Sequence, residues 1–121
     1  MSVVGTALLV ALGGGSGAAL RFVLSRRLDA GLPWGVLVAN VAGSALLGAF
    51  SALALAGVLS STGLALLGTG FCGGFTTYST FAVGTHDLGW RRGAGYTALT
   101  VGLSLTACAA CFVLVATLAG P

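Results

Sequence analysis

Residues 30–85 run for 56 positions without one charged side chain. Two further uncharged runs cover residues 2–20 and residues 93–121. A membrane-spanning helix needs roughly 20 mainly apolar residues, so the three runs have room for one, two and one span in chain order. Only 6% of the residues are charged, against about a quarter in soluble domains. The pattern predicts an all-α membrane protein.

The expected layout is a single domain, residues 1–121, with four transmembrane helices. They are predicted at about residues 3–24, 34–57, 64–85 and 93–118. The apolar runs are too long, and too free of alternation, for the strands of a membrane barrel. Short turns between the spans make neighbouring helices antiparallel.

Arginines indicate how such a chain would sit in the membrane. Arg26 and Arg27 follow the first predicted span, and Arg91 and Arg92 follow the third, while the loop at about residue 60 has none. The positive-inside rule places loops with such arginines in the cytoplasm, so we expect a multi-pass protein of the cell membrane with both basic loops inside. Basic residues confined to span ends disfavour a nucleic-acid partner.

The stretch GFCGGFTTYSTF, residues 70–81, interrupts the third predicted span. Adjacent Gly73 and Gly74 are expected to loosen the helix, and the β-branched Thr76 and Thr77 to hold it open. Unwound backbone at membrane depth is tolerated only inside protein or along a cavity. Its free carbonyl oxygens would suit a small alkali cation. The third helix is therefore predicted to be broken at a functional site.

Four more side chains are candidates for such a site. Tyr78 and Phe81 present aromatic rings on one side, and the positive ring edge can face an anion. Asn40, inside the second span, needs a hydrogen-bonding partner, either another helix or a permeating species. Arg21 either reaches the headgroups or supplies a cation at the mouth of an anion path.

Tyr96, Thr100 and Ser104 recur at intervals of four in the fourth span, which places three hydroxyls in one stripe. Such hydroxyls either bond back to the preceding helical turn or form a polar track. The glycine pairs 13/17 and 70/74 have G-x-x-x-G spacing, which favours close helix packing. Four short helices enclose little alone, so we expect an oligomer.

The sequence offers no acid–base pair and no nucleophile with a base, so an enzyme is not expected. Asp29 and Asp87 fall in predicted loops, whereas a small multidrug transporter would need a carboxylate inside the membrane. Cys108 and Cys111 form a C-x-x-C in an apolar helix, where small surface residues are a simpler explanation than metal or redox chemistry.

The motifs GGGSGAALRF, PWGVLVANVAGSALLG and GTGFCGGFTTYSTF together resemble the Fluc/CrcB fluoride channel family, over essentially the whole chain. The resemblance implies a fluoride-selective channel that passively exports cytoplasmic fluoride and protects the cell from its toxicity. It also implies an antiparallel (inverted) dimer of dual topology with two fluoride pathways.

The resemblance further implies a structural sodium ion (Na+) at the dimer centre, held by the main-chain carbonyls of Gly73 and Thr76. The anion pathway it implies comprises Arg21, Asn40, Tyr78, Phe81, Tyr96, Thr100 and Ser104.

Three positions depart from the family pattern. Tyr78 replaces a phenylalanine, Gly84 a glutamate and Val36 a threonine. The one-sided arginines also favour a single orientation, whereas an inverted homodimer needs balanced loops. We therefore expect a heterodimer with an oppositely oriented homologue rather than a homodimer. A non-conducting subunit that only assembles with such a homologue is the main alternative.

Overall fold

All the named secondary-structure elements are helical in the computed structural model, which describes residues 2–120. In chain order they are α1 (Val3–Leu28), α2 (Trp34–Leu55), α3 (Ser61–Leu64), the π-helical η1 (Ala65–Cys72), α4 (Gly73–Phe75), α5 (Ser79–Asp87) and α6 (Gly89–Ala119).

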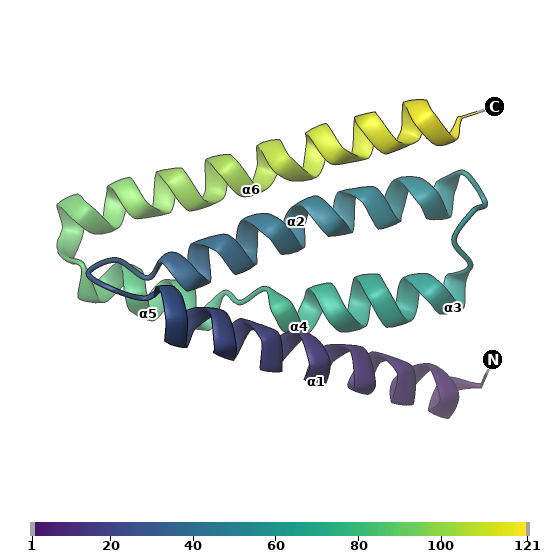
Figure 1. Cartoon of the computed structure of the whole chain (residues 1–121), viewed down its shortest axis with the longest axis horizontal. Coiled ribbons are helices and arrows are strands. Elements are labelled where there is room, and N and C mark those ends of the chain that lie inside the picture. Colours follow the sequence, from purple (N-terminus) through teal and green to yellow (C-terminus); the bar gives the residue numbers. More distant parts are fainter. Residues whose placement is uncertain (1, 121) are drawn as a thin grey trace.

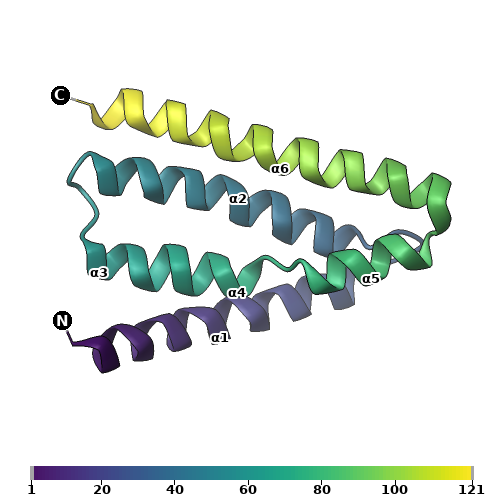
Figure 2. The ribbon, with the colours of Figure 1, turned by 180° about the vertical axis from the view of Figure 1, so that it is seen from behind.

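Three of the helices, α1, α2 and α6, are long and apolar enough to cross a membrane. The all-α membrane prediction is confirmed to that extent. The segment predicted as the third span is divided among α3, η1, α4 and α5, which follow one another along a single direction (Figures 1 and 2). The predicted break is present, and it lies at residues 76–78.

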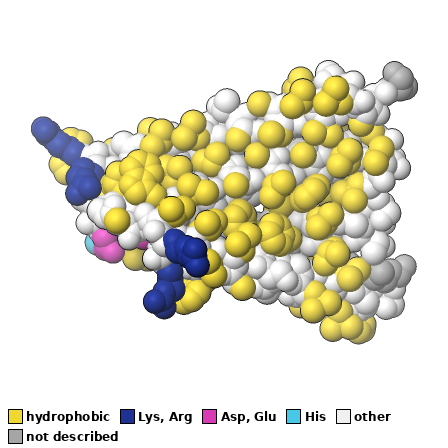
Figure 3. Space-filling view, in the orientation of Figure 1, with side chains coloured by type: hydrophobic (Ala, Val, Ile, Leu, Met, Phe, Trp, Pro, Cys, Tyr) yellow, Lys and Arg dark blue, Asp and Glu magenta, His cyan; other side chains and the backbone are white. Residues whose placement is uncertain are grey.

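The helices extend beyond the predicted spans at the end of the molecule that carries the arginines. Arg26 and Arg27 lie in the last turn of α1, and Arg91 and Arg92 lie in the first turn of α6, so their prediction as loop residues is wrong. At 1.5 Å per residue α1 is about 39 Å long and α6 about 46 Å, against ~30 Å of hydrocarbon. The helices therefore continue into the headgroup region, and charged side chains gather at that end (Figure 3).

Asp87 was also expected in a loop, but it and His86 form the last turn of α5. Both side chains are exposed, and they pair with each other at 3.6 Å.

The two G-x-x-x-G motifs pack against each other. Gly70 lies so close to α1 that an added Cβ would be 3.2 Å from the Cα of Gly13. A Cβ at Gly17 would overlap the backbone of η1, and one at Gly74 would overlap the carbonyl oxygen of Gly14. The predicted close helix contact is thus made within one chain, between α1 and the η1–α4 segment.

The adjacent glycines do not unwind the helix, contrary to the sequence-based prediction. Gly73 has helical dihedral angles, φ −61° and ψ −40°, and both glycines belong to α4. Extended backbone begins at Thr76, with φ −83° and ψ 158°. The smallness of Gly74 is instead needed for the approach to α1, and the β-branched threonines mark the break.

Helix α2 is the central element, with α6 on one side and α1 and η1 on the other (Figure 1). Its side chains Val36 and Ala39 are fully buried, and Ala52 nearly so. Farther along, Gly48 brings α2 against the backbone of Cys108 in α6. This central position directs the adjacent Asn40 toward the break.

The glycine interface predicts a matched pair of stability effects. Gly17→Ala should lower the free energy of unfolding in detergent by about 1–3 kcal/mol, because the added methyl group overlaps η1. Gly15→Ala is the control, since a methyl group added there would meet no neighbouring atom within 4 Å. Thermal or denaturant unfolding followed by circular dichroism measures both. Equal stability of the two variants would contradict the packing described.

Candidate functional site

The α3–α5 rod is the segment made of α3, η1, α4 and α5. The break in this rod leaves backbone groups without their usual helical partners. The N–H of Thr76 still donates to the carbonyl of Cys72 at 2.9 Å, which closes α4. The N–H of Thr77 is directed away from the helix axis, to Asn40, so the carbonyl of Gly73 loses its usual i+4 donor. The Thr77 hydroxyl then caps α5 by accepting the N–H of Thr80 at 3.2 Å.

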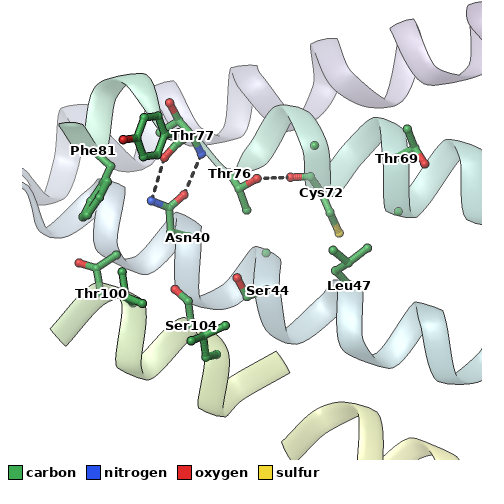
Figure 4. A pocket seen from close by; sticks show the side chains of 16 residues that line it. Asn40, Ser44, Leu47, Thr69, Cys72, Thr76, Thr77, Phe81, Thr100 and Ser104 are labelled. Atoms are coloured by element: carbon green, nitrogen blue, oxygen red, sulfur yellow. Dashed lines mark hydrogen bonds between the residues drawn. The ribbon is translucent and has the colours of Figure 1, made fainter. Parts of the chain in front are cut away.

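Asn40 holds the break through both ends of its carboxamide (Figure 4). Its Nδ2 donates to the carbonyl of Thr77 at 3.0 Å, and its Oδ1 accepts the N–H of Thr77 at 2.8 Å. The carboxamide thus hydrogen-bonds both backbone groups of Thr77, as a residue on a neighbouring β-strand would. Of the two partners the sequence left open for Asn40, the structure provides the protein one, and a second N–H on Nδ2 stays free of these bonds.

Arg21 reaches the same break from α1. Its Nη1 donates to the carbonyl of Thr76 at 3.1 Å, and the contact is half-buried. The guanidinium therefore points inward to the protein instead of only outward to headgroups. Arg21 and Asn40 together bond two successive carbonyls of the break, those of Thr76 and Thr77.

A pocket of about 580 Å³ opens beside the break, between α2, the η1–α4 segment and α6. It brings together most of the predicted site residues: Asn40, Gly73, Thr76, Tyr78, Phe81, Thr100 and Ser104. Tyr96 and Arg21 do not line it. Figure 4 shows Asn40, Thr100 and Ser104 on its walls.

The predicted hydroxyl stripe divides into two parts. The hydroxyl of Tyr96 donates to the carbonyl of Pro33 at 2.9 Å, which secures α6 to the start of α2. The hydroxyl oxygens of Thr100 and Ser104 are buried and have no hydrogen-bond partner within residues 2–120. Neither one bonds back to the preceding turn, and both residues line the pocket, with the hydroxyl of Thr100 also next to that of Tyr96.

Three aromatic rings form a short series beside the break, and two of them, Tyr78 and Phe81, line the pocket. The centroids of Tyr78 and Phe81 are 6.2 Å apart, and those of Phe81 and Tyr96 are 5.8 Å apart. Tyr78 is 81% exposed, whereas Tyr96 is only 4% exposed. The series thus runs from the surface into the protein beside the break.

Oxygen atoms of the main chain are the groups best placed to hold a cation. No cluster of three or more His, Cys, Asp or Glu side chains occurs in the described part of the chain. Gly73 is exposed, with open space on its Cα, and its carbonyl lacks the helical donor. Thr76 has its carbonyl already bonded to Arg21, but a carbonyl oxygen has a second lone pair. Gly73 fits a cation site well, and Thr76 fits as a shared acceptor.

Sequence reasoning missed two polar residues of the pocket and the pairing of a third, Thr77, with Asn40. Thr77 provides the backbone that Asn40 holds, and Ser44 and Thr69 line the pocket. Ser44 lies one turn after Asn40, so helical spacing could have indicated it. The role of Thr77 depends on a contact across 37 positions, which one sequence does not reveal.

At two of the positions that differ from the family pattern, the packing around the residue is well defined. Val36 is fully buried in the core of α2. A Cβ at Gly84 would lie 3.2 Å from Cγ of Pro33, so a larger side chain there requires Pro33 to move. The glycine therefore fits the turn before α2.

The fold and the pocket define a multi-pass helical membrane protein with polar groups at membrane depth. The chain matches the family described as CrcB-like protein, Camphor Resistance (CrcB), over residues 8–116. Since this match covers most of the chain, the protein belongs to the CrcB family.

Curated relatives agree with this assignment. Fluoride-specific ion channel FluC 2 of Rhodococcus jostii is 51% identical over 80 residues, 64% of this chain and 67% of the relative. Fluoride-specific ion channel FluC 1 of Streptomyces avermitilis is 47% identical over 93 residues, 74% of each chain. Fluoride-specific ion channel FluC of Rhizobium leguminosarum is 41% identical over 110 residues, 84% of this chain and 88% of the relative.

Removing the Asn40 carboxamide should loosen the break. Asn40→Ala leaves both backbone groups of Thr77 without their partner, at a cost of about 1–3 kcal/mol for each buried group. Hydrogen exchange at the Thr77 amide should become faster, on the order of tenfold or more. Ser44→Ala, on the same helix and pocket, should leave this amide unchanged. Unchanged exchange in Asn40→Ala would show that the break does not depend on Asn40.

Proposed function

We propose that this protein is a subunit of a fluoride-selective channel that passively exports cytoplasmic fluoride. The observation that carries the proposal is the pair of buried, unpartnered hydroxyls of Thr100 and Ser104 on the wall of the pocket. Its family and the names of its relatives, fluoride-specific ion channels, support the choice of ion. The proposed role is in ion transport, not in enzyme catalysis.

The pocket suits a small anion that must lose its water. The hydroxyls of Thr100 and Ser104 and the spare N–H of Asn40 can each donate to fluoride. The ring edges of Tyr78 and Phe81 add weak positive potential. Several weak sites in succession let the ion enter and also leave. Neutral HF that crosses the membrane ionises inside the cell, and the membrane potential would drive the anion out through such a path.

A sodium ion is proposed at the exposed carbonyl of Gly73, shared with that of Thr76. An unpaired backbone carbonyl facing hydrocarbon is costly, so the exposed side of Gly73 needs a partner, which a cation beneath a protein cover would provide. The ion would supply positive charge for these oxygens, and Arg21 already supplies some for Thr76.

The cover we propose is a second, inverted subunit. The α3–α5 rod would then be a fourth, broken transmembrane segment, and the pocket would be closed between two chains. The pocket side of this rod is open in the single chain: Gly73 and Tyr78 are exposed there. In this arrangement the Gly73 carbonyls of the two subunits would meet at the dimer centre.

We favour a heterodimer with an oppositely oriented homologue over a homodimer. One end of the molecule carries Arg26, Arg27, Arg91 and Arg92 (Figure 3). We place that end in the cytoplasm. An inverted copy of the same chain would put these arginines on the other side. Some relatives have numbered names, FluC 1 and FluC 2, which suits genomes with more than one such chain.

A proton-coupled multidrug transporter is less well supported. Asp29 accepts the N–H of Gly35 at 2.7 Å in the loop before α2, and Asp87 is exposed beside His86. No carboxylate lines the pocket beside the break in the described residues. The remaining alternative is a subunit that assembles with a partner but conducts no ions. Flux measurements must distinguish it from a channel subunit.

Fluoride efflux from liposomes, followed with a fluoride electrode and a chloride control, tests the proposal. We expect slow release from the chain alone, and rapid, fluoride-selective release after reconstitution with an oppositely biased homologue from the same genome. Rapid release from the chain alone would support the channel and overturn the heterodimer. No fluoride release in either case would favour the non-conducting subunit.

The two free hydroxyls should control the rate. Thr100→Val with Ser104→Ala should slow fluoride efflux about tenfold or more, because hydrogen bonds to a charged species are worth about 1.5–3 kcal/mol. Thr106→Val is the matched control, since Thr106 is exposed on α6 outside the pocket. Equal rates in the double variant and the control would remove these hydroxyls from the path.

A further inference from the structure

A second groove lies between α5 and α6, away from the break. Its volume is about 690 Å³, and its lining includes His86, Gly89, Trp90, Ala94, Thr97 and Ala98. It is built by a close approach of the two helices at Gly93, where an added Cβ would be 2.5 Å from the carbonyl oxygen of Thr85. The fluoride path proposed above does not use this groove.

The groove changes character along α6. His86 and Trp90 lie at the end of the molecule where the charged side chains gather (Figure 3). Ala94 and Ala98 follow Trp90 by one and two helical turns, toward the middle of the apolar span. An occupant therefore needs a polar head at the first end and an apolar chain at the other.

The positive charge beside the groove is that of Arg91, whereas Arg92 lines a separate pocket with Leu32 and Tyr96. Arg91 and Arg92 occupy the first turn of α6, which contains no acidic residue and has no side-chain cap. The first turn of a helix is already the positive end of its dipole, so two arginines there are unfavourable without an anion. Within residues 2–120 neither arginine forms an ion pair with a carboxylate.

Trp90 connects the charge of Arg91 to the groove. Its ring is 82% exposed and lies 5.7 Å from the guanidinium carbon of Arg91, which is within cation–π distance. Exposed tryptophans of membrane proteins gather at the level of the headgroups. The arginine is thus held next to the groove at the depth where lipid phosphates lie.

We propose that the groove between α5 and α6 binds one anionic phospholipid, with its phosphate beside Arg91 and an acyl chain along Ala94 and Ala98. An inverted second copy of this chain is a poorer occupant. Its Arg and Asp side chains lie within residues 21–29 and 87–92, so the opposite end, which it would bring to this level, offers no carboxylate side chain to pair with Arg91. The proposal depends only on insertion of the chain in a membrane, not on fluoride transport.

Quenching of Trp90 fluorescence by brominated lipids tests the site. In a Trp34→Phe background Trp90 is the sole tryptophan. Brominated phosphatidylglycerol should then quench more strongly than brominated phosphatidylcholine at equal mole fraction, with a relative binding constant on the order of fivefold. Arg91→Gln should abolish this preference. Arg26→Gln, an equal charge change at the end of α1, should preserve it.

A second variant keeps the test valid if the arginine changes prevent insertion. Ala94→Leu with Ala98→Leu fills the groove at two exposed positions and should reduce quenching by both lipids. Ala109→Leu, an exposed position of α6 outside the groove, is its control. Equal quenching by the two lipids, or loss of the preference in the α1 arginine variant, would overturn the proposal. Absence of quenching by either lipid would also overturn it, because protein would then cover the groove.

Discussion

The arrangement around the break depends on the pairing of one carboxamide with one stretch of backbone. Non-helical backbone inside a membrane protein must find partners within the protein or in a polar cavity. Asn40 provides both a donor and an acceptor to Thr77, and Arg21 provides a donor to Thr76. With these bonds in place the α3–α5 rod can keep its non-helical break at membrane depth, and the pocket beside the break keeps its polar wall.

The close packing of α1 fixes the position of the break. Glycines on both sides let the backbone of α1 approach that of η1 and α4, with contacts such as Gly74 to the carbonyl of Gly14. The same packing places Arg21, one turn after Gly17, within reach of the break. Glycine smallness therefore acts on the site indirectly, through the approach of two helices, whereas flexibility of the glycine pair is not what opens the rod.

Much of the architecture could be predicted from the sequence, because uncharged runs of this length are compatible with little besides membrane helices. The break was also predictable, since glycines, threonines and aromatic residues together are unusual in a span. The arginine positions were misjudged because helices continue past the hydrocarbon boundary. Tyr96 was expected with the other hydroxyls, but its longer side chain reaches the carbonyl of Pro33. The Asn40–Thr77 pair needed the fold itself.

The central claim is that the proposed fluoride conduction depends directly on the geometry of the break. The most direct measurement follows the Thr77 amide exchange rate and the fluoride efflux rate together in Asn40→Ala, Asn40→Asp and Arg21→Gln, reconstituted under conditions in which the wild-type protein conducts. We predict that efflux falls in the same order in which amide protection is lost. An Asn40 variant that loses protection of Thr77 yet conducts fluoride at the wild-type rate would contradict this claim.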